Sequence, residues 1–226
     1  MLSILSLLRS GEYLLAIITI LSRCFVVFCC MPLHECAHAL AAYKLGDDTA
    51  KLKGRLTINP FAHLDLIGTI MIFLVGIGYA NPVPVNAARL KHPRRDMALI
   101  SLAGPASNLI MAFVNVTICL ALVKFGGDSV VMGSICYFFE FAASVNVMLA
   151  VFNLLPIPPL DGSKVLASVL PDKAYFEYMK YERYVMIGLM ALLLFGVLDT
   201  PISILSNFIL KIISFIPSLI FGVKLY

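Results

Sequence analysis

Two apolar runs in this chain are long enough to cross a lipid bilayer as helices. Residues 98–123 carry no charged side chain, and residues 133–155 carry one, Glu140. A helix needs about 20 predominantly apolar residues to span the hydrocarbon core. The composition agrees, because 61% of the 226 residues are hydrophobic and 13% are charged, whereas a soluble domain is about 45–50% apolar and about 25% charged. The sequence therefore predicts an integral membrane protein and excludes a free-standing soluble enzyme.

Three further segments are apolar enough to be membrane helices. Residues 13–45 are predicted to form one long helix that ends at Gly46, and shorter apolar segments follow at 184–198 and 202–223. Residues 66–80 extend for only about 22 Å as a helix, so we expect them to enter the membrane and return. The predicted fold is an all-α multi-pass membrane protein with about five transmembrane helices and one re-entrant segment.

Residues 51–58 alternate between polar and apolar side chains. Lys and Arg dominate one set of alternate positions, and Leu52, Leu56 and Ile58 occupy the other. This period of two predicts a short β-strand or hairpin on the cytosolic side, with one face in water.

The Lys and Arg residues indicate the orientation of the chain. Cytosolic loops of membrane proteins collect these residues. With a re-entrant segment at 66–80, the stretch 44–97 lies on one side and carries eight of them. We therefore expect a protein of the cell membrane with an outer amino terminus and a cytosolic carboxyl terminus. The net charge of +4 is too small and too dispersed to indicate a nucleic-acid partner.

The residues from His34 to His38 form an H-E-x-x-H motif towards the cytosolic end of the first expected span. Positions four apart share one face of a helix, so both imidazoles can bind one zinc ion while Glu35 activates a water molecule. The alternative is two histidines packed at a helix end, which is disfavoured because ionisable residues near membrane depth are costly and usually functional. Pro32 is expected to kink the helix just before the motif, since it cannot donate a hydrogen bond to the carbonyl of Phe28.

A catalytic zinc ion usually keeps three protein ligands and one open position. Six residues are candidates for the third ligand: His63, Asp65, His92, Asp96, Glu140 and Asp161. Asp161 is favoured because prolines at 156–159 break a span near the cytosolic face, and because Gly162 lets the backbone turn so that the carboxylate points back into the protein. The alternative is that Asp161 caps a helix that starts at Ser163.

Two asparagines are expected to support the chemistry. The oxyanion that develops during peptide hydrolysis needs a hydrogen-bond donor besides the metal. Asn153, eight residues before Asp161, is predicted to supply one, the alternative being an asparagine that caps the broken helix end. Asn108 follows small residues around Gly104 that permit close approach to the helix of the zinc motif, so it is expected to reach the catalytic core or to bond between helices.

Three motifs follow one another along the chain: His34-Glu35-x-x-His38, Gly104-Pro105-x-x-Asn108, and Asn153-x-x-Pro156 with Leu160-Asp161-Gly162. Together they resemble the site-2 protease family of intramembrane zinc metalloproteases. The stretches 54–60 and 81–86 further resemble the short prokaryotic form of that family, which lacks PDZ and CBS domains. The resemblance extends from about residue 32 to residue 162.

The resemblance implies a set of roles. His34, His38 and Asp161 would bind one zinc ion per chain, and Glu35 would be the catalytic base. The substrates would be transmembrane segments of other proteins, cleaved in the lipid bilayer with the active site towards the cytosol. The oligomeric state and the physiological substrate are left open, and Glu140 matches no motif of the family.

A transmembrane helix hides its peptide bonds in its own hydrogen-bond ladder, so such a substrate must unwind before hydrolysis. Pairing with a sheet edge would replace the lost hydrogen bonds. Two edges are available in the sequence, the predicted strand with Leu56 and Ile58 and the extended run with Pro82 and Pro84. The alternative is a purely structural hairpin.

The expected organisation is a single polytopic membrane domain over residues 1–226, with a catalytic core in 13–162 and C-terminal helices in 163–226. The expected function is that of an intramembrane endopeptidase, and two other functions were weighed. An ion or metal transporter could use the same His and Asp cluster, but it predicts repeat-related sites and the sequence has no internal repeat. An inactive scaffold would have lost Glu35 or a ligand, and all four residues are present.

Overall fold

The computed structural model describes residues 4–65, 70, 81–127, 129–171, 174, 178 and 180–223. The described residues form helices and connecting loops, with no strand among them. The elements of the amino-terminal half are α1 (Ile4–Arg9), α2 (Tyr13–Phe25), a π-helical turn η1 (Val26–Cys30), α3 (Met31–Lys44), α4 (Thr49–Leu52) and two 3-10 turns, η2 (Pro60–Ala62) and η3 (Ala87–Arg89). The remaining elements are α6 (Pro93–Phe125), α7 (Val130–Asn153), α8 (Asp161–Val169), α10 (Glu182–Leu194) and α11 (Asp199–Phe221).

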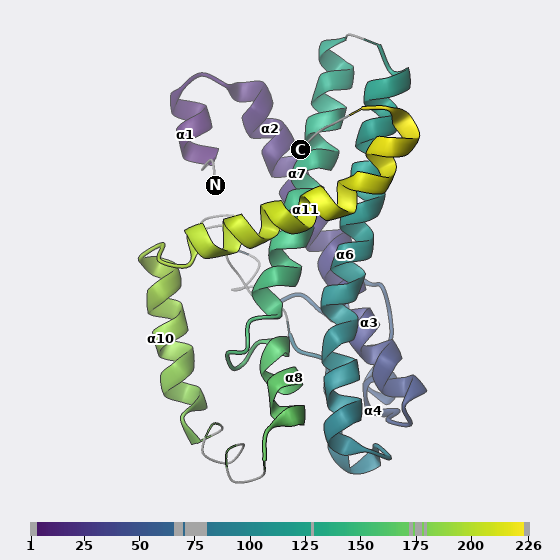
Figure 1. The fold of residues 1–226 in the computed structure, drawn as a ribbon, viewed down its shortest axis with the longest axis vertical. Coiled ribbons are helices and arrows are strands. Elements are labelled where there is room, and N and C mark those ends of the chain that lie inside the picture. The colour runs from purple at the N-terminus through teal and green to yellow at the C-terminus, as the bar shows by residue number, and fades with distance from the viewer. Residues whose placement is uncertain are drawn as a thin grey trace.

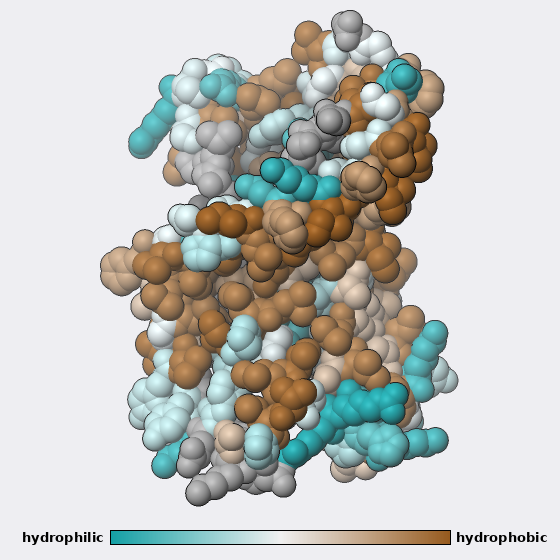
Figure 2. Space-filling view, viewed as in Figure 1, coloured by the Kyte–Doolittle hydropathy of each residue, from teal (hydrophilic) through white to brown (hydrophobic). Residues whose placement is uncertain are grey.

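Four stretches of continuous helix are long and apolar enough to cross a membrane: Tyr13–Lys44, Pro93–Phe125, Val130–Asn153 and Asp199–Phe221. Apolar side chains cover much of the molecular face between more polar ends (Figure 2). A mostly helical membrane protein is therefore confirmed. Helix α10 has 13 residues and is about 20 Å long, shorter than a hydrocarbon core of about 30 Å, so the count of five spans stays a prediction. The predicted re-entrant segment 66–80 lies outside the described residues, apart from residue 70.

The first long helix is continuous from Tyr13 to Lys44 through the π-helical turn η1. This turn ends two residues before Pro32, where the missing N–H was expected to disturb the hydrogen-bond ladder. The helix ends as predicted at Gly46, whose φ is +106°. The N–H groups of Gly46 and Asp47 bond back to the carbonyls of Tyr43 and Ala42, at 3.2 and 2.9 Å, which is the Schellman pattern of a helix end.

The strand predicted for residues 51–58 is wrong. Thr49–Leu52 form the short helix α4 instead. Its start is fixed because the carboxylate of Asp47 accepts hydrogen bonds from the backbone and the hydroxyl of Thr49. It ends at Gly54 in a second Schellman pattern, with Gly54 at φ +68°. The alternation that suggested a strand spans one helical turn and the loop that follows it.

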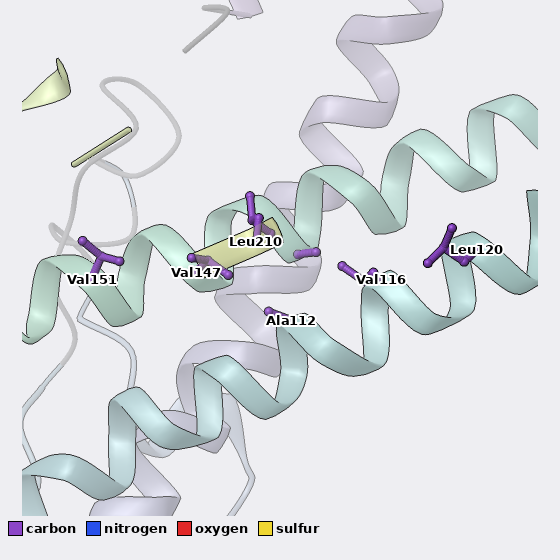
Figure 3. Close-up of a cluster of buried hydrophobic side chains, with 7 residues drawn as sticks. Ala112, Val116, Leu120, Val147, Val151 and Leu210 are labelled. Carbon is purple, nitrogen blue, oxygen red and sulfur yellow. The ribbon is translucent and has the colours of Figure 1, made fainter. Parts of the chain in front are cut away.

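Helix α6 is the centre of the molecule, because α3, α7, α8 and α11 all pack against it. Helices α6 and α7 form an antiparallel pair, and α11 crosses them at a steep angle (Figure 1). Their shared core is drawn in Figure 3 and contains Ala112, Val116 and Leu120 of α6, Ala143, Val147 and Val151 of α7, and Leu210 of α11. Lipid is as apolar as these side chains, so such helices associate through close packing, which small residues allow.

Helix α3, which bears the H-E-x-x-H motif, packs against the first half of α6. Ala42 of α3, Ile100 of α6 and Leu90 form a second buried cluster. Helices α3, α4 and α8 and the beginning of α6 lie at the same end of the molecule (Figure 1). The fold thereby gathers residues that are far apart in the sequence at one end of the bundle.

Candidate metal centre and active site

Three buried side chains from two helices converge at the end of the bundle where α3, α8 and the beginning of α6 lie. His34 and His38 lie one turn apart on α3, and their Nε2 atoms are 3.0 Å apart. Asp161 is the first residue of α8, and its Oδ2 lies 3.4 Å from Nε2 of His34 and 3.2 Å from Nε2 of His38. Among the described residues, this is the only group of three or more His, Cys, Asp or Glu residues close enough to hold a metal ion. Of the six candidates for the third ligand, the structure brings Asp161 to the two histidines.

The donor set fits a zinc ion. Zinc binds imidazole nitrogen and carboxylate oxygen at about 2.0–2.1 Å in a tetrahedron, which places ligand atoms about 3.3 Å from one another. The three distances of 3.0, 3.2 and 3.4 Å match that spacing. Two imidazole lone pairs and a carboxylate at such distances repel one another unless a cation or a shared proton lies between them. His34, His38 and Asp161 could therefore supply three ligands to one metal ion.

A backbone contact fixes the ring of His38. Its Nδ1 lies 2.7 Å from the carbonyl oxygen of Ile100 on α6. A carbonyl only accepts hydrogen bonds, so Nδ1 of His38 carries a proton, and its Nε2 lies toward His34 and Asp161. The corresponding Nδ1 of His34 is buried and has no hydrogen-bond partner among the described residues. The structure thus orients His38 through α6.

Gly104 brings α6 against the two histidines. A Cβ atom at this position would lie 2.3 Å from Nε2 of His38 and 2.6 Å from Cε1 of His34. No such contact is possible without a shift, so only glycine allows this packing. The close approach expected at Gly104 is confirmed.

Asp161 is positioned by the broken end of α7. A Cβ atom on Gly162 would lie 2.2 Å from the carbonyl oxygen of Leu154 and 2.5 Å from that of Leu155. Gly162 is inside α8 and its φ is not positive. The expectation that Gly162 lets the backbone turn is therefore wrong, because the residue is needed for the close approach of α8 to the end of α7. The alternative of a helix starting at Ser163 is also wrong, since α8 starts at Asp161.

The electrostatics of Asp161 favour the ionised form. Burial raises the pKa of this carboxyl, but hydrogen bonds and charge interactions with His34 and His38 outweigh the burial and hold the pKa far below its ordinary value. Lys164, one turn further along α8, places its Nζ 3.7 Å from Oδ1. The lowered pKa favours the ionised carboxylate, which is the form that can bind a metal ion.

Glu35 lies between the two histidines in the sequence and is only partly buried. It makes no hydrogen bond or ion pair with any described residue. A carboxylate without such a partner can accept a proton from a water molecule. Glu35 follows His34 directly in the motif, and its role as the catalytic base stays a prediction.

The other ligand candidates lie in different surroundings. His63 is fully buried and donates from Nε2 to the carbonyl of Thr57 at 2.8 Å. Asp96 accepts a hydrogen bond from the backbone of His92 at the beginning of α6. Glu140 lies in the middle of α7. None of them joins the group of His34, His38 and Asp161.

The two predicted asparagines are placed differently from each other. Asn153 is the last residue of α7, and its amide donates to the carbonyl of Leu149 at 2.9 Å, which uses one of its two N–H groups. Asn108 is fully buried in α6, one turn after Gly104, and no described residue donates a hydrogen bond to its Oδ1. Both lie on the helices that frame the site.

The structure tests the two segments that were predicted to pair with the substrate. Leu56 and Ile58 lie in the loop after α4, so the strand edge expected there does not form. Pro82 and Pro84 lie in a run without helix or turn from residue 81 to residue 86. No helix or turn forms at the second of the two expected places, where each proline restricts the residue before it to extended conformations.

Sequence reasoning missed two groups that shape this site. The carbonyl of Ile100 orients His38, and no sequence signal marks it because every residue has a carbonyl. Asp47 ties the end of α3 to residue 86. A signal for Asp47 existed, since an Asp directly after a helix-ending glycine and two residues before a Thr favours a local side-chain hydrogen bond.

Comparisons with known proteins agree with this geometry. The profile of Peptidase family M50 matches residues 119–196. The chain is 44% identical over 154 residues to "Putative zinc metalloprotease YwhC" of Bacillus subtilis, covering 67% of this chain and 70% of that protein. It is 36% identical over 141 residues to a protein of the same description, Rip2 of Mycolicibacterium smegmatis, covering 58% of this chain and 50% of that protein. No solved structure matches the chain significantly.

The similarity to the Bacillus protein extends over more than two thirds of its length. Together with the profile match and the buried His, His and Asp group, it establishes the family and the chemistry. The chain belongs to peptidase family M50, the site-2 protease family, and is a zinc metalloprotease.

Proposed function

We propose that the protein is an intramembrane endopeptidase that hydrolyses peptide bonds within transmembrane segments of other membrane proteins. The observation that carries this proposal is the position of the ligand group. His34 and His38 lie on a continuous apolar helix of 32 residues, and Asp161 begins α8 after the short loop that follows the apolar helix α7. A metalloprotease with ligands on such helices acts on chains that lie in the membrane.

His34, His38 and Asp161 would hold the zinc ion, and Glu35 would be the general base. Bound zinc polarises the substrate carbonyl and lowers the pKa of water. Glu35 accepts the proton of the attacking water and passes it to the leaving amine. The hydrogen bond to Ile100 keeps His38 in the required tautomer during this exchange.

Asn153 would stabilise the oxyanion. One N–H of its amide bonds to Leu149, and the second is available to donate to the oxygen of the substrate carbonyl as charge develops there. Asn108, which has a buried Oδ1 without a described donor, would bind the substrate backbone or a water molecule near the ligands. The loop with Leu56 and the exposed Ile58 and the run with Pro82 and Pro84 would contact the substrate chain.

The active site would face the cytosolic side. Helix α3 ends at Lys44, and α6 begins next to Arg94 and Arg95, at the same end as the ligand group. Cytosolic ends of membrane helices collect such cations.

The experiment is cleavage of a reporter transmembrane segment in detergent by the wild type and by Glu35→Gln. We expect Glu35→Gln to lose at least about a hundredfold in rate, because general acid–base catalysis contributes about 10²–10⁴, while the zinc content stays near one ion per chain. The matched control is Glu12→Gln, an exposed glutamate before α2, which should cleave like the wild type. Chelation of zinc should abolish cleavage.

Equal activity of the wild type and Glu35→Gln would disprove the proposed mechanism. Zinc binding without any cleavage by the wild type would instead favour the transporter or the inactive scaffold.

A further inference from the structure

Residues 81–86 form a strap that is fastened at both ends. At the first end, the backbone N–H of Asn81 donates to the carbonyl of His63 at 2.8 Å, and its side-chain amide donates to the carbonyl of Leu64 at 3.1 Å. At the second end, the backbone N–H of Asn86 donates to Oδ2 of Asp47 at 2.6 Å. We refer to residues 81–86 as the strap.

The middle of the strap carries backbone groups that the described residues leave without a hydrogen bond. Its residues 82–85 make no backbone hydrogen bond with any described residue. Pro82 and Pro84 have no N–H, whereas Val83 and Val85 offer both N–H and carbonyl groups. Alternate residues of an extended chain direct these groups to opposite sides. The N–H and carbonyl groups of Val83 and Val85 can therefore pair with another extended chain, as those of proline-containing edge strands do.

Asp47 connects this edge to the zinc ligands. Its side chain is fully buried, and its backbone N–H bonds to the carbonyl of Ala42 in the last turn of α3. Its Oδ1 accepts two hydrogen bonds, from the backbone and the hydroxyl of Thr49, and its Oδ2 accepts the bond from Asn86. One carboxylate thus joins the helix that carries His34 and His38 to the end of the strap.

Apolar packing also joins the strap to α3 and α6. Val85 and Leu90 pack with Ala42 of α3 and Ile100 of α6. The carbonyl of that same Ile100 orients His38. The strap and the ring of His38 therefore share Ile100 as a support.

We infer that Asp47 is a positioning residue for the substrate. It holds the strap at a fixed position relative to His34, His38 and Asp161. This inference rests on the proposed function and names the strap as the edge that binds the unwound transmembrane segment. Asp47 itself touches neither the substrate nor the reacting atoms. A buried carboxylate is costly, and here its cost is offset by the hydrogen bonds from Thr49 and Asn86.

The neighbouring Asp48 provides the control. It forms an ion pair with Arg89, and both side chains are nearly half exposed. It lies at the same junction and carries the same charge, but exposed ion pairs contribute little. Asp48→Asn should therefore leave the strap in place.

The experiment measures KM and kcat for a reporter transmembrane segment with the wild type, Asp47→Ala, Asp47→Asn and Asp48→Asn, together with their zinc content. We expect Asp47→Ala to raise KM about tenfold or more, because hydrogen bonds to a charged group are lost, with kcat and zinc content changed less than twofold. Asp47→Asn keeps an acceptor oxygen for Asn86 and should show an intermediate KM. Asp48→Asn should match the wild type.

A photocrosslinking residue in place of Val83, in the inactive Glu35→Gln background, reports the contact directly. We expect crosslinks to the reporter segment, with a yield that falls in Asp47→Ala and is retained in Asp48→Asn. An unchanged yield and KM in both Asp47 variants, or a loss of zinc and kcat at an unchanged KM, would overturn the role of Asp47. If the strap fails to crosslink in a protein that cleaves normally, the strap is not the docking edge, although the protease assignment stands.

Discussion

Gly104 is the residue on which the geometry of the ligands most depends. Its hydrogen atoms lie where any side chain would press on the rings of His34 and His38. Alanine stabilises an ordinary helix by about 0.5–1 kcal/mol over glycine, so a harmful effect of alanine here reports the contact and not the helix.

We predict that Gly104→Ala lowers zinc affinity and cleavage at least about tenfold, since catalytic groups displaced by about 1 Å lose rate steeply. Zinc titration and cleavage of the reporter segment measure both quantities. Gly133→Ala in α7 is the matched control, because a Cβ there meets no atom within 4 Å. Wild-type affinity in Gly104→Ala would show that α6 moves away without cost.

The residues of the metal group were predictable because their chemistry is rare in apolar sequence. The spacing of His34 and His38 placed both rings on one face, and the proline break marked Asp161. The role of Gly162 was not predictable, since a glycine that avoids a clash and one that permits a turn look alike in a sequence. Whether Asn153 acts on the oxyanion stays a prediction.

At the scale of elements, the short segment after α3 shows where pattern reading fails. Eight residues with alternating polarity suit a strand, but the side chain of Asp47 starts a helical turn there and Gly54 ends it. Local hydrogen bonds from one carboxylate outweighed the pattern. Long elements such as α6 and α7 carry no such ambiguity, because only a helix satisfies their backbone in lipid.

The junction made by Asp47 should respond to acid. Burial raises the pKa of this carboxyl, but hydrogen bonds from Thr49 and Asn86 and the charge of Arg89 outweigh the burial and hold the pKa below its ordinary value of 3.8. A lowered pKa in the folded state means that the ionised group stabilises the fold above pH 3.8 and that this contribution is lost as the pH falls through the folded-state pKa.

We therefore predict that Asp47→Asn is less stable than the wild type by about 1.5–3 kcal/mol at neutral pH, and that this difference shrinks as the pH falls below 3.8. Thermal or denaturant unfolding in detergent at a series of pH values measures it. A difference that stays constant with pH would assign the effect to packing and not to the charge.

For the whole molecule, the long helices and the end at which the site lies followed from the distribution of apolar and basic residues. The steep crossing of α11 over α6 and α7 (Figure 1) did not. Crossing angles depend on how side chains such as Leu210 fit between neighbouring helices. The pattern of apolar residues in the sequence does not determine that fit.

The proposed orientation predicts opposite labelling of two single-cysteine variants in intact cells. Lys124→Cys at the exposed end of α6 should react with a membrane-impermeant maleimide, whereas Lys53→Cys after α4 should react only after permeabilisation. The unsubstituted protein gives the background from its native cysteines. The reverse pattern would invert the topology, and labelling of both positions in intact cells would mean that α6 does not cross the membrane.

The convergence of His34, His38 and Asp161 also has a mechanical meaning. These side chains join the first long helix to a helix that begins about two thirds of the way along the chain. A metal ion shared by them acts as a cross-link that closes a very long loop, the kind of closure that restricts the unfolded chain most. The ion that supports hydrolysis would then also stabilise the fold by linking α3 to α8.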